Sequence, residues 1–459
     1  MIKKTAIFLI IVISLQLFSG IPSASAEVFR DLAAQSAILV ERETGIVLYD
    51  NNMYMRHPAD ALAKVITLLI AAEAVENDLI SDNELITMTD TAWHDIYENS
   101  TTLDIEPDEI MTFIDLMYSA YVGNANEACN MIALRLAGSI DSFVNMMNQK
   151  AVEIGATNTR FMNPHGQYHE SQYTSAFDQY LIFDEAMKNS LFSEIASTYR
   201  HITESIDEFE SRALSSTNAL LNQSSRYYFR SCIAGRDSAT YEGGYSLVAL
   251  TDEDGMSLIS VVLGANVHVF EDESTEMRNF SETLRMVQWG FNQFAWRDIL
   301  KTTDLLARVK VLHGSGADFV NARPESSLTL LLNNSIPTES FERDIIIYSD
   351  EDDDPLIAPV SAGDVLGEVI ITYEGIEYAR KALVANTDIS LNGIEYIRRQ
   401  VSAMLSSSLA RNVMIALAIL LFLYIVLVVR YNIVRANRLR RIKNAKNDII
   451  RERHENFRD

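Results

Sequence analysis

The sequence has few cysteines, few prolines and a deficit of basic side chains, and each shortage excludes a class of protein. Its 459 residues include 2 cysteines, too few for a disulfide framework or a self-contained thiolate zinc site. With 8 prolines, 18 glycines and 48% hydrophobic residues, the chain is neither fibrous nor wholly disordered. Lysine and arginine number 38 against 63 aspartates and glutamates, so the formal charge is −25. That balance argues against a nucleic-acid binder acting through its bulk surface.

The N-terminus has the pattern of a secretory signal. Lys3 and Lys4 precede an apolar run over residues 5–18, and Ser23-Ala24-Ser25-Ala26 offers small residues at the −3 and −1 positions of a cleavage site. We predict a signal peptide over 1–26 that is cleaved after Ala26. An uncleaved membrane anchor is the alternative, and both would export the rest of the chain.

The C-terminus predicts a single membrane-spanning helix. Residues 413–429 carry no charge and, at ~1.5 Å per residue, extend roughly 26 Å, close to the thickness of a hydrocarbon core. Ten lysines and arginines against four acids follow in 430–459, a bias that predicts a cytoplasmic tail able to bind anionic lipid. An amphipathic juxtamembrane segment is predicted over 391–412. The exported part, 27–411, then carries 26 basic against 59 acidic side chains, or −33.

The pattern between the two ends predicts an α+β domain over 27–300 and a small all-β domain over 301–390. Asp60 is expected to cap a helix that runs to Glu76, and residues 201–222 are expected to form a loop with a short helix. The order of hairpin, helices, strands and helix predicts that the first strand pairs with late ones. The expected hairpin covers 36–49, the other helices 107–121, 126–137, 140–154, 175–188 and 275–294, and the other strands 227–232, 245–251 and 257–265. Six short strands are expected in the second domain.

Several segments, in order, resemble the low-molecular-mass penicillin-binding proteins, the serine D-alanyl-D-alanine carboxypeptidases. The resemblance covers nearly the whole exported part. It implies a penicillin-binding-protein and β-lactamase-like transpeptidase fold followed by that family's C-terminal β-module. The segments are SAILVERETGIVLYDNN (36–52), HPADALAKVITLLIAAE (57–73), NPHGQYHESQYTSAFD (163–178), YSLVALTDEDGMSLISVVLGA (245–265) and APVSAGDVLGEV (358–369).

The resemblance implies three catalytic motifs, and this sequence departs from all of them. The first, Ser-x-x-Lys, places both side chains on one helical face so that the amine can take the serine proton. It falls on Ala61-Leu62-Ala63-Lys64, where the lysine is kept and the nucleophile is alanine. The second, Ser-x-Asn, falls on Asn124-Ala125-Asn126, where only the asparagine is kept.

The third motif, Lys-Thr-Gly on a strand edge, would bind the terminal carboxylate of the substrate. Counting back from Gly244 places it on Arg236-Asp237-Ser238, where no residue matches. Asp237 could pair with Arg236 and would repel a carboxylate. A change of register does not recover the motifs, because residues 58–64 contain no Ser, Thr or Cys and 225–245 contain no Lys-Thr-Gly or Lys-Ser-Gly.

The retained polar residues can have either a structural or a functional role. Lys64 is either a remnant general base or a lysine whose head reaches solvent or pairs with a nearby acid. Asn126 is either a ligand-facing amide or a structural hydrogen-bonding group near a helix N-terminus, and His165 is expected to be a turn residue. Cys129 and Cys232 are expected to be free buried thiols, with a disulfide as the alternative.

The resulting functional prediction is a membrane-anchored, cell-wall-facing homologue of a serine-type carboxypeptidase that is catalytically inactive. It would bind a peptidoglycan stem peptide or a cell-wall protein, with no nucleic-acid partner, no cofactor and no metal. Calcium at the acidic run 350–355 is a weak alternative, because the spacing is not that of an EF-hand. One competing hypothesis is an active peptidase with displaced chemistry, using Asp60 and Lys64 with water. Another is a structural membrane protein that acts through its basic tail.

Overall fold

The computed structural model describes residues 32–98, 100–207, 209–351, 355–406 and 408–455. The predicted signal peptide and the middle of the acidic run therefore lie outside the described residues. The chain divides into two compact units. The first is Met1–Trp296 with Leu331–Ser335, and the second is Arg297–Leu330 with Ile336–Asp459.

The first unit is built on a five-stranded antiparallel sheet with strand order β2-β1-β9-β8-β7. The predicted pairing of the first strand with a late one is confirmed, since β1 lies beside β9. The β8–β9 hairpin closes through Asp254 and Gly255, both with positive φ, as a tight two-residue turn requires. The strands are β1 (Ser36–Glu41), β2 (Val47–Asn51), β7 (Cys232–Thr240), β8 (Gly244–Glu253) and β9 (Met256–Ala265).

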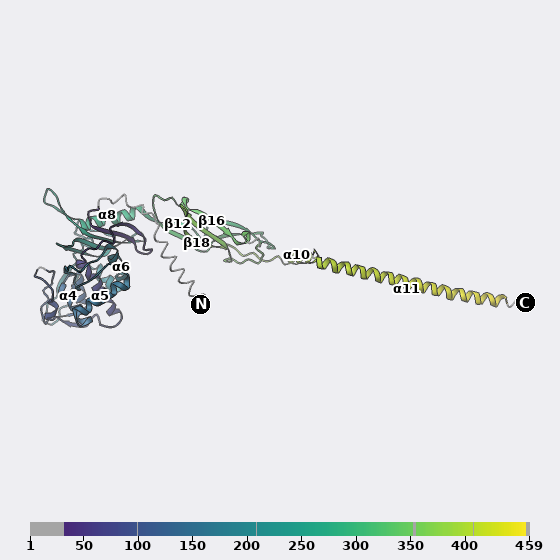
Figure 1. The fold of residues 1–459 in the computed structure, drawn as a ribbon, viewed down its shortest axis with the longest axis horizontal. Helices are drawn as coiled ribbons and strands as arrows, with labels where there is room; N and C mark the ends of the chain where they lie inside the picture. Colours follow the sequence, from purple (N-terminus) through teal and green to yellow (C-terminus); the bar gives the residue numbers. More distant parts are fainter. Residues whose placement is uncertain (1–31, 99, 208, 352–354, 407, 456–459) are drawn as a thin grey trace. The chain divides into compact units, whose positions relative to one another are not determined.

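Helices cover both faces of this sheet, which explains why its central strands are almost wholly buried. Helix α8 (Arg278–Gln293) packs on one face and the remaining helices lie on the other (Figure 1). Helix α2 (Ala63–Glu76) is apolar nearly all round and forms the centre of the larger core. The other helices are α3 (Phe113–Tyr121), α4 (Asn126–Ala137), α5 (Ile140–Ile154), α6 (Ala176–Ala186) and α7 (Ser190–Ser197).

Side-chain caps fix the starts of four of these helices. Thr112, Ser139, Ser175 and Asn189 each accept a backbone N–H from the first turn of the helix that follows. Short elements connect the helices and strands of this unit: η1 (Asp60–Leu62), η2 (Asp90–Trp93), and the strand pairs β3 (Leu85–Thr87) with β4 (Ile110–Thr112), β5 (Arg200–Ile202) with β6 (Ala213–Ser215), and β10 (Val267–Val269) with β11 (Thr275–Met277).

Several local predictions are wrong. Asp60 caps no helix, because it lies in η1 with positive φ and its carboxylate accepts from Thr240 instead. The strand expected over 227–232 begins at Cys232 and runs to Thr240. Residues 201–222 hold the β5–β6 pair and, where the structure describes them, no α-helix. The helix expected from 107 starts at Phe113, since Ile110–Thr112 pairs as strand β4.

The second unit contains a five-stranded antiparallel sheet with order β13-β14-β18-β17-β16. These strands are β13 (Ala307–Lys310), β14 (Phe319–Pro324), β16 (Glu342–Ile347), β17 (Val365–Tyr373) and β18 (Ile376–Ala385). Strand β12 (Phe294–Leu300) pairs with β15 (Leu328–Asn333), and the division between the two units falls within both strands. Short helices η3 (Thr338–Ser340) and α9 (Tyr348–Glu351) belong to the second unit.

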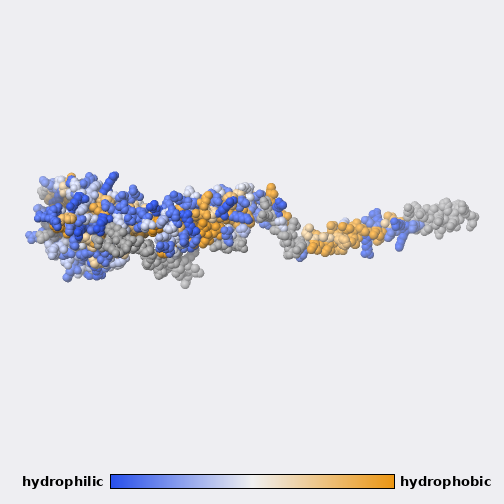
Figure 2. Space-filling model, turned by 90° about the horizontal axis from the view of Figure 1, so that it is seen from above, coloured by the Kyte–Doolittle hydropathy of each residue, from blue (hydrophilic) through white to orange (hydrophobic). Residues whose placement is uncertain are grey.

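Two helices end the chain, α10 (Gly393–Ser406) and α11 (Ser408–Glu455). Within α11, residues Asn412–Arg441 are long and apolar enough to cross a membrane, and this stretch has no buried side chains. Figure 2 shows its apolar surface, in orange, followed by a hydrophilic one, in blue. The helix continues through most of the basic tail, which the sequence pattern did not predict.

Candidate functional site

A cleft of about 790 Å³ opens where η1, the loop before α4 and the free edge of β7 meet. Most of the positions assigned to the three motifs line it or lie directly behind its wall. The lining residues are Ala61, Tyr97, Ser100, Thr101, Asn124, Asn126, His165, Gly166, Gln167, Tyr168, Thr217, Asp237, Ser238, Ala239, Thr240, Tyr241 and Glu242.

Ala61 lies in the cleft at the entry to α2, where a nucleophile would have to be. Its methyl group has no oxygen or sulfur to attack a carbonyl. Its backbone N–H donates to Ser238 Oγ at 3.2 Å. Ser238 lies on β7 at the last position of the third motif, so this N–H already has a hydrogen-bond partner. A backbone N–H beside a nucleophile is the kind of group that stabilises an oxyanion, and here a hydroxyl already binds it.

Lys64 lies close behind Ala61 but has no access to solvent. Its side chain is 1% exposed, and Nζ donates to the backbone carbonyl of Asn124 at 2.6 Å. Burial lowers the pKa of Lys64 to about 7; Cys129 and Glu127 oppose this shift, while the Arg236 guanidinium adds to it. The expected contact with solvent or with an acid is not found, since Lys64 forms no ion pair with any acid that the structure describes.

We expect Lys64→Met to change how stability depends on pH. An unfolded lysine binds its proton up to its ordinary pKa of 10.5, whereas folded Lys64 releases it near 7. Between these values the unfolded state binds more protons, so this lysine makes the wild-type chain more stable as pH rises, by up to about 1.4 kcal/mol per pH unit. The variant lacks this contribution, so its free energy of unfolding relative to that of wild type should fall from pH 7 to pH 10. Urea unfolding at both pH values checks this, and parallel pH profiles would contradict it.

The replaced residues of the second and third motifs bind each other. Arg236 is 1% exposed; its Nη1 donates to the Tyr121 carbonyl at 2.6 Å and its Nη2 donates to Asn124 Oδ1. Asn124 has a φ of 58°, a left-handed conformation that asparagine tolerates better than most residues. The Arg236 guanidinium therefore points into the wall, and it is not among the groups that line the cleft.

Asp237 does not pair with Arg236, contrary to the possibility raised by their adjacency in sequence. Its Oδ1 accepts from the Thr217 hydroxyl at 2.6 Å, on the cleft side of β7. Successive side chains of a strand point to opposite faces, which separates the two charges. Asn126 is the first residue of α4, is buried and lines the same cleft, so both interpretations of this residue stay open.

His165, which lines the cleft, and Asp60, which lies behind its wall and is bound by Thr240, are both buried. His165 Nδ1 accepts from the Gln167 N–H at 3.2 Å, as expected of a turn residue, while its Nε2 has no partner among the described residues. Burial, with a smaller contribution from Lys64, lowers the pKa of His165 to about 3, so the ring is neutral. Burial raises the pKa of Asp60 to about 6, against the Thr240 hydrogen bond that lowers it.

Sequence inspection missed Glu127, a wholly buried acid in the first turn of α4. Its Oε1 accepts from the Leu103 N–H at 2.6 Å, and burial raises its pKa. Nothing in the local pattern marks it, because an acid near a helix N-terminus is ordinarily a solvent-exposed group. Both cysteines are free, as expected, although Cys129 is buried and Cys232 is only half-buried.

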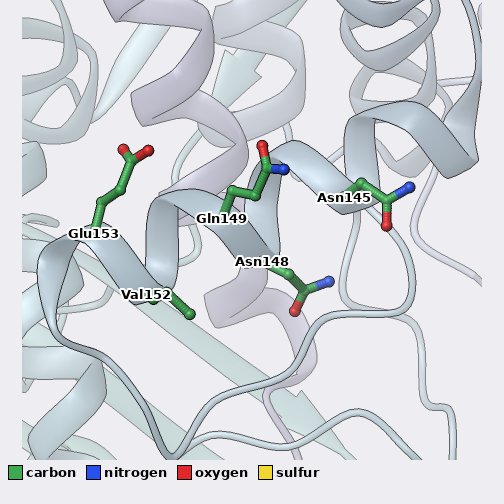
Figure 3. Close-up of a pocket in the computed structure, with 5 residues that line it drawn as sticks. All are labelled: Asn145, Asn148, Gln149, Val152 and Glu153. Atoms are coloured by element: carbon green, nitrogen blue, oxygen red, sulfur yellow. The ribbon is translucent and has the colours of Figure 1, made fainter.

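A second depression, of about 560 Å³, lies on the surface of α5 and shares no residue with the cleft. Figure 3 shows its lining: three amides, one valine and one carboxylate, all from that single helix. The Asn148 amide in it already donates to the carbonyls of Val144 and Phe161. Its lining offers no nucleophile and none of the motif positions.

Comparison with known proteins gives a consistent result. A family model described as D-alanyl-D-alanine carboxypeptidase matches residues 22–267. The chain is 27% identical over 368 residues to D-alanyl-D-alanine carboxypeptidase DacF of Bacillus subtilis, covering 80% of this chain and 88% of that protein. It is 26% identical over 365 residues to D-alanyl-D-alanine carboxypeptidase DacC of Escherichia coli, covering 78% and 85%.

Solved structures agree on the fold. Penicillin binding protein 5 from Haemophilus influenzae superimposes with a TM-score of 0.55 at 22% identity, over 78% of this chain and 98% of that one. Penicillin binding protein 6B from Escherichia coli gives a TM-score of 0.57 at 20% identity, over 80% and 98%. The architecture expected from the sequence, α+β with a penicillin-binding-protein-like domain, is confirmed.

Proposed function

The chain belongs to the D-alanyl-D-alanine carboxypeptidase family, and from that premise we propose that it is a non-hydrolytic member that uses the family's cleft for binding. The observation that carries the proposal is Ala61, which stands at the entry to α2 beside the cleft with no attacking atom. Without a nucleophile, neither a peptide nor a penicillin can form an acyl-enzyme at this position.

Three further contacts support loss of hydrolysis. Ser238 occupies the Ala61 N–H, which would otherwise be free to bind an oxyanion. Lys64 Nζ is bound to a backbone carbonyl behind the wall. Arg236 is held by Tyr121 and Asn124, so its charge is not presented to a carboxylate in the cleft. Each contact occupies a group that acyl transfer would need to be free.

The cleft itself is retained, and this supports a binding role. Its 790 Å³ is within the range of small-ligand sites, and it presents hydroxyl, amide and phenol groups suited to a peptide. We propose that the bound ligand is a peptidoglycan stem peptide, and that binding regulates peptidoglycan metabolism. We also propose that Asn412–Arg441 of α11 anchors the chain in the cell membrane with the cleft outside and the basic end inside at anionic lipid.

The alternative of displaced chemistry finds little support. Asp60 and Lys64 are both about 1% exposed, and neither lines the cleft. Asp60 accepts from Thr240 while Lys64 donates to Asn124, so each is bound to a different part of the wall. A water activated by either group would have no direct path to a peptide bond in the cleft.

The test is covalent labelling by a fluorescent penicillin, with release of D-alanine from a D-alanyl-D-alanine peptide as a second assay. The full chain in detergent is expected to give no labelled band after denaturation and no D-alanine above the buffer rate. An active carboxypeptidase of the family serves as the positive control. Stoichiometric labelling, or release abolished by Lys64→Ala, would contradict the proposal.

A further inference from the structure

We infer that the cleft selects its peptide through an ammonium group on the ligand and has no requirement for a terminal carboxylate. The inference rests on the proposed binding role of the same cleft. A basic third motif would select a ligand with a carboxylate, whereas this cleft would select a ligand with an ammonium group.

The charged lining of the cleft is acidic. Asp237 and Glu242 line it, and no lysine or arginine of the described residues does. The two cations at the motif positions, Lys64 and Arg236, are buried behind the wall and bound to Asn124 and Tyr121. A carboxylate entering the cleft would therefore meet like charge, and an ammonium would meet opposite charge.

Both acids have oxygens left to bind a ligand. Asp237 is half-buried and uses only Oδ1, as the acceptor for the Thr217 hydroxyl. The carboxylate of Glu242 is exposed and forms no hydrogen bond or ion pair within the described part of the chain. They lie on β7 and just beyond its end, so one extended ligand along this strand edge can reach both.

His165 supplies an independent indication of a ligand. Its ring is 2% exposed and lines the cleft, and Nε2 has no partner among the described residues. Because Nδ1 accepts from the Gln167 N–H, the neutral ring carries its proton on Nε2 as an unused donor. A buried unpaired donor is costly, and the carbonyl oxygen of a peptide would satisfy it.

Tyrosine rings complete the description of the ligand. Tyr97, Tyr168 and Tyr241 line the cleft and are 66%, 46% and 99% exposed, so their faces are free. Exposed phenol rings bind both aliphatic chains and cations. Acids, a carbonyl-directed donor and aromatic faces together describe a site for a peptide that carries a primary amine on an aliphatic side chain.

The experiment measures binding of four synthetic peptides to the full chain in detergent by isothermal titration calorimetry. All contain one lysine, have a blocked N-terminus and end in D-alanyl-D-alanine. The lysine amine is free or acetylated, and the C-terminus is a carboxylate or an amide. Acetylating the amine is expected to weaken binding about 10-fold or more, which is about 1.4 kcal/mol. Amidating the C-terminus is expected to leave binding unchanged or to strengthen it.

Variants in which an acid is replaced by its amide show which side chains bind the ammonium group. Glu242→Gln combined with Asp237→Asn should weaken the free-amine peptide about as much as acetylation does and should leave the acetylated peptide unaffected. Glu106→Gln removes an exposed acid of the same unit that lies outside the cleft, and it should bind like wild type. Thermal unfolding of each variant verifies that it is folded.

The outcomes separate this inference from the proposed function. Binding that ignores the amine, or that needs the carboxylate, would overturn the inference and leave the binding role intact. Failure of all four peptides to bind would overturn both the binding role and the inference. Release of D-alanine during the titration would overturn the proposed loss of hydrolysis, whichever amine dependence is found.

Discussion

A chain carrying Ala61→Ser, Asn124→Ser, Arg236→Lys, Asp237→Thr and Ser238→Gly is expected to be acylated by fluorescent penicillin to stoichiometry. Ala61→Ser alone is expected to react at least about 1000-fold more slowly. The reason is that the serine would gain a nucleophilic oxygen while its own N–H stayed bound to Ser238 Oγ and no cation faced the cleft. Loss of one oxyanion donor alone costs roughly 100- to 1000-fold in rate.

Variants that carry only some of the five substitutions show which contact blocks acylation. Adding Ser238→Gly to Ala61→Ser should raise the rate more than adding it to a variant without the serine, because groups that act as a unit are not additive. Ser238→Ala is the matched control, since it frees the same N–H while keeping a side chain on β7. Full labelling of Ala61→Ser alone would show that the second and third motif positions do not block the chemistry. No labelling of the five-fold variant would place the defect elsewhere in the cleft.

Most of the fold was predictable, because burial leaves a periodic trace in sequence. The hairpins, the helices at 126–137 and 140–154 and the late strand pair follow from apolar spacing and turn residues. Strand β7 was misplaced because Tyr227–Cys232 is the more strand-like run by composition, whereas the true strand carries Arg236, Asp237 and Ser238. Polar residues are tolerated there because β7 is an edge strand beside a cleft.

The candidate site was predictable in position but not in side-chain direction. Family resemblance gives the positions of Ala61, Lys64 and Arg236 along the chain. It cannot show that Lys64 ends on a backbone carbonyl or that Arg236 turns into the wall. Those directions depend on contacts with Tyr121 and Asn124, which lie between 60 and 115 residues away in sequence. Such contacts have no local signature, and Glu127 was missed for the same reason.

Replacing Arg236 with alanine is expected to destabilise the first unit by about 3 kcal/mol. The change would leave the Tyr121 carbonyl and Asn124 Oδ1 without their donors and would open a cavity in a well-packed wall. Urea unfolding followed by tryptophan fluorescence reports on this unit, because Trp93, Trp289 and Trp296 all lie in it. The fluorescence of all three tryptophans is expected to change when the unit unfolds.

Two comparisons distinguish the proposed contacts from a general loss of positive charge. Arg160→Ala removes an exposed arginine of the same unit and should change stability by less than about 0.5 kcal/mol. Asn124→Gly removes the amide without straining a positive φ, so Arg236→Ala and Asn124→Gly together should cost about 1 kcal/mol less than the sum of the single changes. Additive losses, or an Arg236→Ala chain as stable as wild type, would mean that Arg236 does not hold Asn124. In that case the guanidinium would be free to turn toward the cleft, and a carboxylate-ended peptide would again be a candidate ligand.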